Sequence, residues 1–175
     1  LTPLGRCTDV PLLRAVVKPP VDGESQRRVE ALRGDLARLK ATRDAGRCVE
    51  AERLAQELIP RARAAGYGPL LADALNAAAL LADACIEIPV ALARWDESFR
   101  EALAARDDEA AVEAAINTAA YTADRVGNVA DARRWLGIGQ ALLARVGDEP
   151  VLRIWALVSE DIVLLREGRG AGPNK

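Results

Sequence analysis

Nucleophilic and acid–base chemistry lack their usual residues in this chain. The sequence contains no histidine, so a serine or cysteine nucleophile would have no imidazole base beside it. The run GRGAGP contains spaced glycines, but it follows a predicted helix and leads only into PNK, so no phosphate-facing helix begins there. Acidic side chains are plentiful, yet they neighbour arginines on predicted helix faces, where solvated surface is their usual place. We expect a non-catalytic chain that binds no cofactor.

The cysteines give no metal site either. Cys7, Cys48 and Cys85 lie far apart in the sequence without a C-x-x-C motif, and a zinc ion needs clustered Cys or His ligands. We expect three small buried thiols in a reducing environment, and therefore a cytoplasmic protein.

Charge and hydropathy argue against two classes of partner. The formal net charge is −2, whereas nucleic-acid-binding domains usually carry a basic excess on one face. No secretory signal opens the chain, and no apolar run reaches the roughly 18 residues of a membrane span. The best candidate, residues 151–165, contains Arg153, Glu160 and Asp161. We expect neither nucleic acid nor a membrane as the partner of this segment.

Hydrophobic periodicity predicts an all-α protein. Half of the residues are hydrophobic, mainly alanine and leucine, which favour helices. Glycine and proline separate seven segments with helical spacing, the first capped by Ser25. These predicted helices cover residues 25–45, 48–65, 69–86, 89–106, 107–126, 129–146 and 149–167. Residues 1–24 are predicted to be a linker with a short capping helix beginning near Asp9, and residues 168–175 a flexible tail.

The predicted helices recur with a period of about 40 residues, which is typical of a helical solenoid. The turns fall near Gly46, Glu87, Gly127 and Glu167. Two helices, at residues 71–84 and 112–125, align at an offset of 41 residues. Their matched polar residues are Asn76 with Asn117 and Asp83 with Asp124. Among the alternate helices, the predicted matches are Leu54 with Trp95 and Trp135, and Leu58 with Phe99.

Two segments resemble the turn and second helix of a tetratricopeptide repeat. AGRCVEAERLAQEL and VGNVADARRWL each place a glycine at the turn and a small alanine five residues later. These residues are Gly46 with Ala51 and Gly127 with Ala132. The middle repeat departs from the pattern, with Glu87 and Leu92 at those places. The resemblance covers residues 25–167 and implies a right-handed superhelix of about three and a half antiparallel helix pairs.

A second resemblance spans nearly the whole chain. Its parts are a C-x-D…L stretch before Pro19-Pro20, a V-x-x-L-R helix, the run A-G-R, and GYGPLLADAL at residues 66–75. In this order they resemble the repeat region that follows the kinase domain in bacterial serine/threonine protein kinases of the myxobacterial type. The resemblance implies a regulatory or partner-recruiting segment. The start at Leu1 and the absence of methionine predict a fragment or a processed piece of a longer protein.

The tetratricopeptide resemblance also implies roles for the repeated polar residues, because the first helix of each pair lines a concave groove in that family. It implies that Asn76 and Asn117 grip the backbone of a bound protein or peptide, and that Tyr121 packs a ligand side chain. The alternative is that these asparagines tie neighbouring helices together. Groove acidity, which favours a positively charged ligand, would come from Asp73, Asp83, Glu113 and Asp124.

Two other functions stay open at this point. The repeats could be a spacer or oligomerisation scaffold without a groove ligand, or a small-molecule or peptide sensor, which a deep enclosed pocket would favour. The last predicted helix carries more apolar residues than one neighbour can cover. Either further repeats follow it, or this face joins two copies into a homodimer.

Overall fold

The described part of the chain is helical from one end to the other. The computed structural model describes residues 18, 20–147 and 149–168, and these contain no strand. The short helix predicted near Asp9, the cysteine at position 7 and most of the predicted tail lie outside the described residues. The prediction of an all-α protein is confirmed for the described part.

Seven α-helices and one π-helical turn follow one another along the described residues. They are α2 (Gly23–Asp44), α3 (Cys48–Ala65), α4 (Gly68–Cys85), α5 (Ile88–Ala104), α6 (Asp108–Tyr121), η2 (Thr122–Val126), α7 (Val129–Val146) and α8 (Pro150–Arg166). All seven predicted helices are present, with ends within two residues of the prediction, except that the last turn of the fifth is the π-helical η2.

Local chemistry at the helix ends explains these bounds. The Asp22 side chain accepts a hydrogen bond from the backbone N–H of Ser25 at 2.8 Å, so Asp22 caps α2 and the predicted cap at Ser25 is wrong. At the other ends, Gly66 and Gly127 close α3 and η2 with φ values of 67° and 75°. This left-handed conformation favours glycine, because it has no Cβ to clash.

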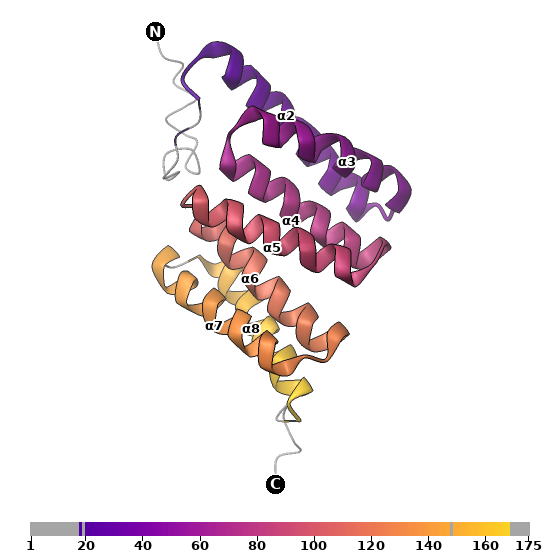
Figure 1. The fold of residues 1–175 in the computed structure, drawn as a ribbon, viewed down its shortest axis with the longest axis vertical. Helices are drawn as coiled ribbons and strands as arrows, with labels where there is room; N and C mark the ends of the chain where they lie inside the picture. Colours follow the sequence, from indigo (N-terminus) through magenta and orange to yellow (C-terminus); the bar gives the residue numbers. More distant parts are fainter. Residues whose placement is uncertain (1–17, 19, 148, 169–175) are drawn as a thin grey trace.

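The helices stack as antiparallel pairs along the long axis of the molecule (Figure 1). We call α2, α4, α6 and α8 the first helices, and α3, α5 and α7 the second helices. Each helix packs against its neighbours in sequence, and each first helix also contacts the first helix of the next pair. This helical-repeat-like architecture leaves the surface formed by the first helices continuous from pair to pair.

Burial confirms the offset of 41 residues for the first helices. Three sets of buried residues follow it from α4 through α6 or η2 to α8. They are Ala74, Ala115 and Ala156; Ala77, Thr118 and Ser159; and Leu81, Thr122 and Val163. Equivalent positions therefore meet equivalent packing in successive repeats.

The second helices require a correction of one residue. Ala51, Ala91 and Ala132 are each fully buried near the start of their helices, so the small alanine is present in the middle repeat and Leu92 is not its equivalent. The turn between α4 and α5 is one residue shorter than the turn between α2 and α3. An alignment anchored on the turns therefore runs one residue out of register.

The same shift changes the predicted aromatic matches. The buried rows that follow the alanines are Ala55, Trp95 and Leu136, then Leu58, Ser98 and Gly139. The predicted matches of Trp95 with Leu54 and Trp135, and of Leu58 with Phe99, are therefore wrong. Phe99 and Trp135 instead lie beside the buried rows. Their rings pack edge to face there, with ring centroids 5.1 Å apart.

Cys48 and Cys85 are joined in a disulfide, contrary to the prediction of separate buried thiols. They are 37 positions apart, but the antiparallel packing of α3 and α4 brings the start of one helix beside the end of the other, with Cα atoms 5.6 Å apart. Sequence distance alone cannot reveal this pairing. The bridge ties the first helix pair to the second.

Helix α4 is the one described helix with the length and composition of a membrane span. This differs from the prediction that no segment reaches that length and that residues 151–165 come nearest. In this fold α4 is largely buried against α2, α3, α5 and α6. Its apolar composition is explained by its place at the centre of the stack.

Candidate functional site

The candidate site is the surface shared by the first helices α4 and α6. The seven residues predicted to contact a ligand lie on these helices or on the π-helical turn that continues α6. Asp73, Asn76 and Asp83 belong to α4, Glu113, Asn117 and Tyr121 to α6, and Asp124 to η2. The structure places Asp73 and Glu113 near the start of the two helices, Asn76 and Asn117 in their middle, and Asp83, Tyr121 and Asp124 near their end.

Near the start, two carboxylates are held away from water. Burial raises the pKa of Asp73 to about 6, with Lys40 opposing and the negative charges of Asp107 and Glu113 adding to the effect. Burial likewise raises the pKa of Glu113, with Lys40 and Arg43 opposing. Lys40 opposes both shifts, so Asp73 and Glu113 both lie close to this lysine of α2.

Neither of these carboxylates is neutralised by direct contact. Among the described residues, Asp73 and Glu113 form no salt bridge and no side-chain hydrogen bond. Asp107, by contrast, caps α6 by accepting a hydrogen bond from the N–H of Ala110 at 3.1 Å. Asp73 and Glu113 therefore keep their acceptor oxygens available, in surroundings of low dielectric where a cationic group would bind strongly.

At the other end, both predicted acidic residues lie near arginines, but only Asp124 is in close contact with one. Asp83 lies 4.0 Å from a guanidinium nitrogen of Arg125, a long contact, and its Oδ1 has no hydrogen-bond partner among the described residues. Asp124 accepts a hydrogen bond from Nε of Arg166 in α8 at 3.2 Å. The predicted contribution of Asp124 to an acidic groove is thus largely offset within the chain, whereas that of Asp83 is offset only by the long contact to Arg125.

Tyr121 belongs to the same end and packs into the fold. Its ring stacks on Trp95 of α5, with ring centroids 4.8 Å apart and planes 24° from parallel. Burial, together with the carboxylate of Asp83, raises its pKa to about 12. One face of the ring is therefore occupied by Trp95, and a ligand side chain can meet only the other face.

The two asparagines differ although they occupy equivalent positions. Asn76 is 2% exposed, and its Nδ2 donates to the carbonyl oxygen of Ala110 in α6 at 3.3 Å, as the structural alternative predicts. Its Oδ1 has no hydrogen-bond partner among the described residues. Asn117 is only half buried. Of the two, Asn117 is the one that a bound peptide can reach.

Sequence reasoning missed the basic residues of α2. Arg33, Lys40 and Arg43 all influence the pKa of Asp73 or Glu113. Arg33 and Lys40 are seven residues apart, which places them two turns apart on one side of a helix. The sequence could therefore have shown that these basic residues share one side of α2. Only the packing of α2 on α4 shows that this side lies near the carboxylates.

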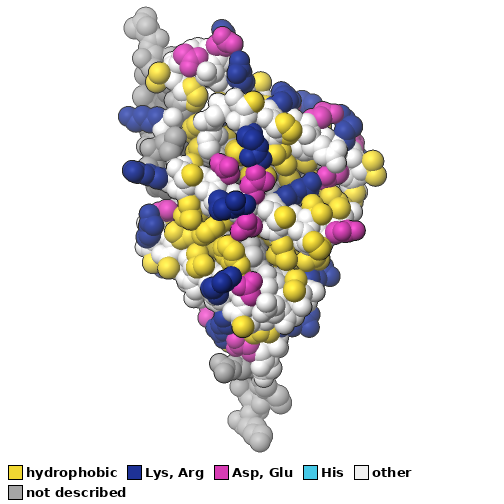
Figure 2. Space-filling model, in the orientation of Figure 1, with side chains coloured by type: hydrophobic (Ala, Val, Ile, Leu, Met, Phe, Trp, Pro, Cys, Tyr) yellow, Lys and Arg dark blue, Asp and Glu magenta, His cyan; other side chains and the backbone are white. Residues whose placement is uncertain are grey.

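The opposite charges are mixed over the face seen in Figure 2. Lysine and arginine side chains alternate there with aspartate and glutamate, and hydrophobic patches lie between them (Figure 2). That face carries no extended area of a single sign. It therefore lacks the basic stripe that nucleic-acid-binding domains usually show.

No metal cluster is present among the described residues, since no three Cys, Asp or Glu side chains there lie close enough to hold an ion. Comparison with known proteins gives no relative: no protein-family model, no curated protein and no solved structure matches this chain.

Proposed function

We propose that this chain is a tetratricopeptide-like right-handed superhelix that binds a protein or peptide on its first helices. The observation that carries the proposal is the pair of shielded carboxylates, Asp73 and Glu113, which lie on neighbouring first helices without a salt bridge to any described residue. An unpaired carboxylate in a partly buried site is unfavourable in the free protein. A ligand cation removes that penalty and gains a charge-assisted hydrogen bond.

The repeat arrangement supports the superhelical form. First helices contact first helices along the stack, and the buried positions recur at an offset of 41 residues. Small residues such as Ala51, Ala91 and Ala132 let the second helices approach closely at the same place in each pair. Pairs that repeat the same contact with a constant rotation generate a curved array with one continuous inner surface.

The expected ligand is an extended segment carrying at least one lysine or arginine. Its cation would lie between Asp73 and Glu113, where a hydrogen bond to a charged group contributes roughly 1.5–3 kcal/mol. Asn117 lies one turn further along α6 from Glu113, and its amide can both donate to and accept from a peptide backbone. Recognition therefore combines one charged contact with one contact that is independent of sequence.

A regulatory context follows from the resemblance to bacterial kinase repeats. In that context the segment recruits a substrate or regulator, and the kinase chemistry resides elsewhere in a longer protein. A cytoplasmic location is part of this proposal and rests on the kinase resemblance alone, because the Cys48–Cys85 disulfide removes the argument from reduced thiols. The reading frame upstream of Leu1 tests it, since the proposal requires kinase motifs there.

A random-peptide display library, selected on the purified chain, tests the ligand chemistry. We expect enrichment of peptides that contain lysine or arginine, with dissociation constants measured by calorimetry on synthetic copies. The double variant Asp73→Asn/Glu113→Gln should bind these peptides at least tenfold more weakly.

The matched control removes the same charges elsewhere. The double variant Glu57→Gln/Asp96→Asn neutralises two carboxylates on α3 and α5, which belong to the second helices, and should retain wild-type affinity. Equal losses in both double variants would mean that net charge alone attracts the peptides. Failure to enrich any basic peptide would overturn the proposal.

A scaffold without a ligand is the second candidate, and Asn76 favours it. Its hydrogen bond to Ala110 ties α4 to α6, so at least one of the two repeated asparagines has a structural role. A chain that selects no peptide but whose stability depends on both asparagines would support the scaffold.

A further inference from the structure

The open side of the first helices changes character between α6 and α8. Four side chains that remain partly exposed on α6 and η2 are Glu113, Asn117, Tyr121 and Asp124. The offset of 41 residues matches them with four residues of α8, which we call the α8 stripe. These are Ile154, Val158, Ile162 and Leu165. Positions that are polar or aromatic on α6 are therefore all apolar on α8.

The α8 stripe is one row that is open to solvent. Its members are three or four residues apart, so they follow one another along a single side of the helix. Ile154, Val158 and Leu165 are exposed by 59%, 42% and 62%, and Ile162 is partly exposed. A contiguous apolar row of this kind is typical of an interaction surface.

A further helix pair stacked on α8 would not cover this row. Helix α6 has neighbours on both sides, since it contacts α4 and α5 as well as α7 and α8. Even so, Glu113 and Asn117 stay partly exposed, because no neighbouring helix lies over that side of α6. Their equivalents on α8, Ile154 and Val158, therefore lie where the repeat leaves the surface open to a ligand.

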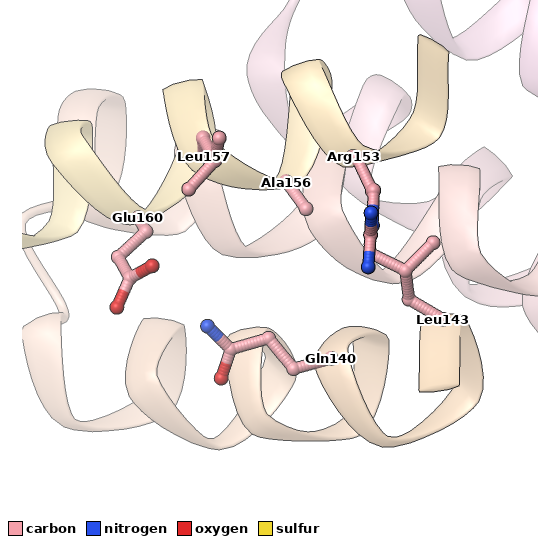
Figure 3. A pocket seen from close by; sticks show the side chains of 6 residues that line it. All are labelled: Gln140, Leu143, Arg153, Ala156, Leu157 and Glu160. Carbon is pink, nitrogen blue, oxygen red and sulfur yellow. The ribbon is translucent and has the colours of Figure 1, made fainter. Parts of the chain in front are cut away.

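The exposed residue Leu157 belongs to a different side of α8. Its equivalent on α6, Ile116, is 1% exposed, because Gly139 of α7 packs directly against it. Leu157 lines a groove between α7 and α8, together with Gln140 and Leu143 (Figure 3). This is a position for helix packing. Leu157 thus separates the α8 stripe from the rest of the apolar surface of α8 and provides a control.

The α8 stripe continues the candidate site along the stack. Helix α6 lies between α4 and α8 and contacts both, and Ala115 and Ala156 show that α6 and α8 bury the same side. A segment that crosses from Asp73 over Glu113 in the direction of the C-terminus therefore meets Ile154 next. The continuous surface presents carboxylates first and apolar side chains second.

We propose that the segment whose cation lies between Asp73 and Glu113 also carries apolar side chains, which pack on the α8 stripe; this inference rests on the proposed function. Packed helix axes lie roughly 8–10 Å apart, and an extended chain advances roughly 3.3 Å per residue. The apolar residues should therefore lie about three to five positions from the lysine or arginine. The ligand is a basic segment with neighbouring apolar residues, and a cation alone is not sufficient.

The peptides selected by display on the full chain give the first test. They should carry leucine, isoleucine, valine or an aromatic residue at a constant distance from their basic residue. One selected peptide is then compared with a copy in which serine replaces the apolar residues. By calorimetry, the serine copy should bind the wild type at least tenfold more weakly.

Substitutions on α8 give the second test. Ile154→Gln/Val158→Asn should bind the selected peptide at least tenfold more weakly than the wild type, yet bind the serine copy equally well. The far-ultraviolet circular dichroism spectrum should not change, because both side chains are exposed. The matched control Leu157→Gln, on the same helix and 62% exposed, should retain wild-type affinity for both peptides.

The outcomes separate this proposal from the proposed function. Basic peptides without a recurring apolar residue, or peptides that bind Ile154→Gln/Val158→Asn as they bind the wild type, would overturn it and leave the proposed function standing. An equal loss in Leu157→Gln would overturn it too, because the effect would not be specific to the α8 stripe. Selection of no basic peptide would overturn the proposed function itself, and this proposal with it.

Light scattering after size exclusion tests whether a second copy covers the α8 stripe instead. The wild type without peptide should have the mass of one chain, or a mass that Ile154→Gln/Val158→Asn leaves unchanged. A dimer that this double variant dissociates would assign the α8 stripe to self-association and overturn the proposal.

Discussion

Asp73 illustrates how a single side chain can link folding to binding. Its carboxylate lies in a mostly buried position near α2, and burial raises its pKa to about 6. Folding therefore favours its protonated form, and the charged form is unfavourable until a cation binds. The same residue that would attract a ligand thus lowers the stability of the free protein at neutral pH.

The stability of the free chain should consequently depend on pH at this residue. A folded-state pKa above the unfolded value of 3.8 gives a stabilising contribution that is present below pH 4 and is lost as the pH rises through 6. One pKa unit corresponds to about 1.4 kcal/mol. Allowing for partial exposure, Asp73→Asn should raise the free energy of unfolding at pH 7 by roughly 1–2 kcal/mol.

Urea unfolding at pH 7 and pH 4 measures this effect. The difference between the variant and the wild type should shrink toward zero at the lower pH. Asp96→Asn, on the exposed face of α5, is the control and should change stability little at either pH. A loss of stability in Asp73→Asn at pH 7 would contradict the assignment of a buried, unpaired carboxylate.

The two asparagines at equivalent repeat positions, Asn76 and Asn117, give a second prediction about single residues. Asn76→Ala removes the hydrogen bond to the carbonyl of Ala110 and should lower the free energy of unfolding by roughly 1 kcal/mol. Asn117→Ala should change stability by less than about 0.5 kcal/mol but weaken peptide binding. Thermal unfolding and calorimetry on the same samples separate the two. Identical behaviour of both variants would argue against different roles.

The sequence could predict which residue types gather on the first helices but not which charges are already paired. Asp73, Asp83, Glu113 and Asp124 are equally acidic in a one-dimensional pattern. Asp124 meets Arg166, 42 positions away, only because α8 packs beside η2. Nothing in the sequence alone distinguishes that carboxylate from Asp73.

Helix boundaries were predictable because glycine, proline and capping residues act locally. The register between the second helices could not be predicted, because one residue more or less in a turn shifts the alignment of every later position. The fully buried Ala91 shows the true register, and it follows from helix packing. The Cys48–Cys85 bridge was missed for the same reason, since it depends on how α3 lies against α4.

The contact between α6 and α7 depends on the absence of a side chain at Gly139. A Cβ built there would stand 2.7 Å from Cγ2 of Ile116, and this branched methyl group cannot move aside freely. Gly139→Ala should therefore lower the free energy of unfolding by roughly 1–3 kcal/mol, although alanine is the better helix former.

Gly34 provides the control, because it lies within α2 with no heavy atom near its missing Cβ. Gly34→Ala should raise the free energy of unfolding by about 0.5–1 kcal/mol. Chemical denaturation of both variants measures the contrast. If both substitutions stabilised the protein, the tight approach of α6 and α7 would be wrong.

The disulfide makes a further prediction about how the first two helix pairs are held together. It joins residues 37 positions apart, and in the chain-entropy view a closed loop of this size contributes roughly 3–4 kcal/mol. Reduction, or Cys48→Ser/Cys85→Ser, should lower the thermal midpoint accordingly. A thiol-alkylating reagent should label Cys48 and Cys85 only after reduction. Because Cys7 is a third cysteine outside the bridge, the labelled residues are identified by peptide mass spectrometry. Labelling of Cys48 or Cys85 without reductant would contradict the bridge.

At the scale of the whole molecule, the all-helical, repeating architecture was predictable from periodicity and composition. Repeats at a near-constant interval reproduce one local packing several times, so small errors at single positions do not change the overall class. What the sequence could not supply is the set of contacts between pairs. Those contacts decide which polar residues remain available on the first helices and leave α8 uncovered.

The central claim is that the first helices present an open site whose unpaired carboxylates, Asp73 and Glu113, bind a cationic peptide. Titrating a ¹⁵N-labelled sample with a peptide obtained by display selection, and following amide chemical shifts, locates the contact most directly. We predict that the largest shifts fall on α4 and α6 around Asp73, Glu113 and Asn117, and that they disappear in Asp73→Asn/Glu113→Gln. Shifts confined to α3, α5 and α7, or unchanged by that substitution, would contradict it.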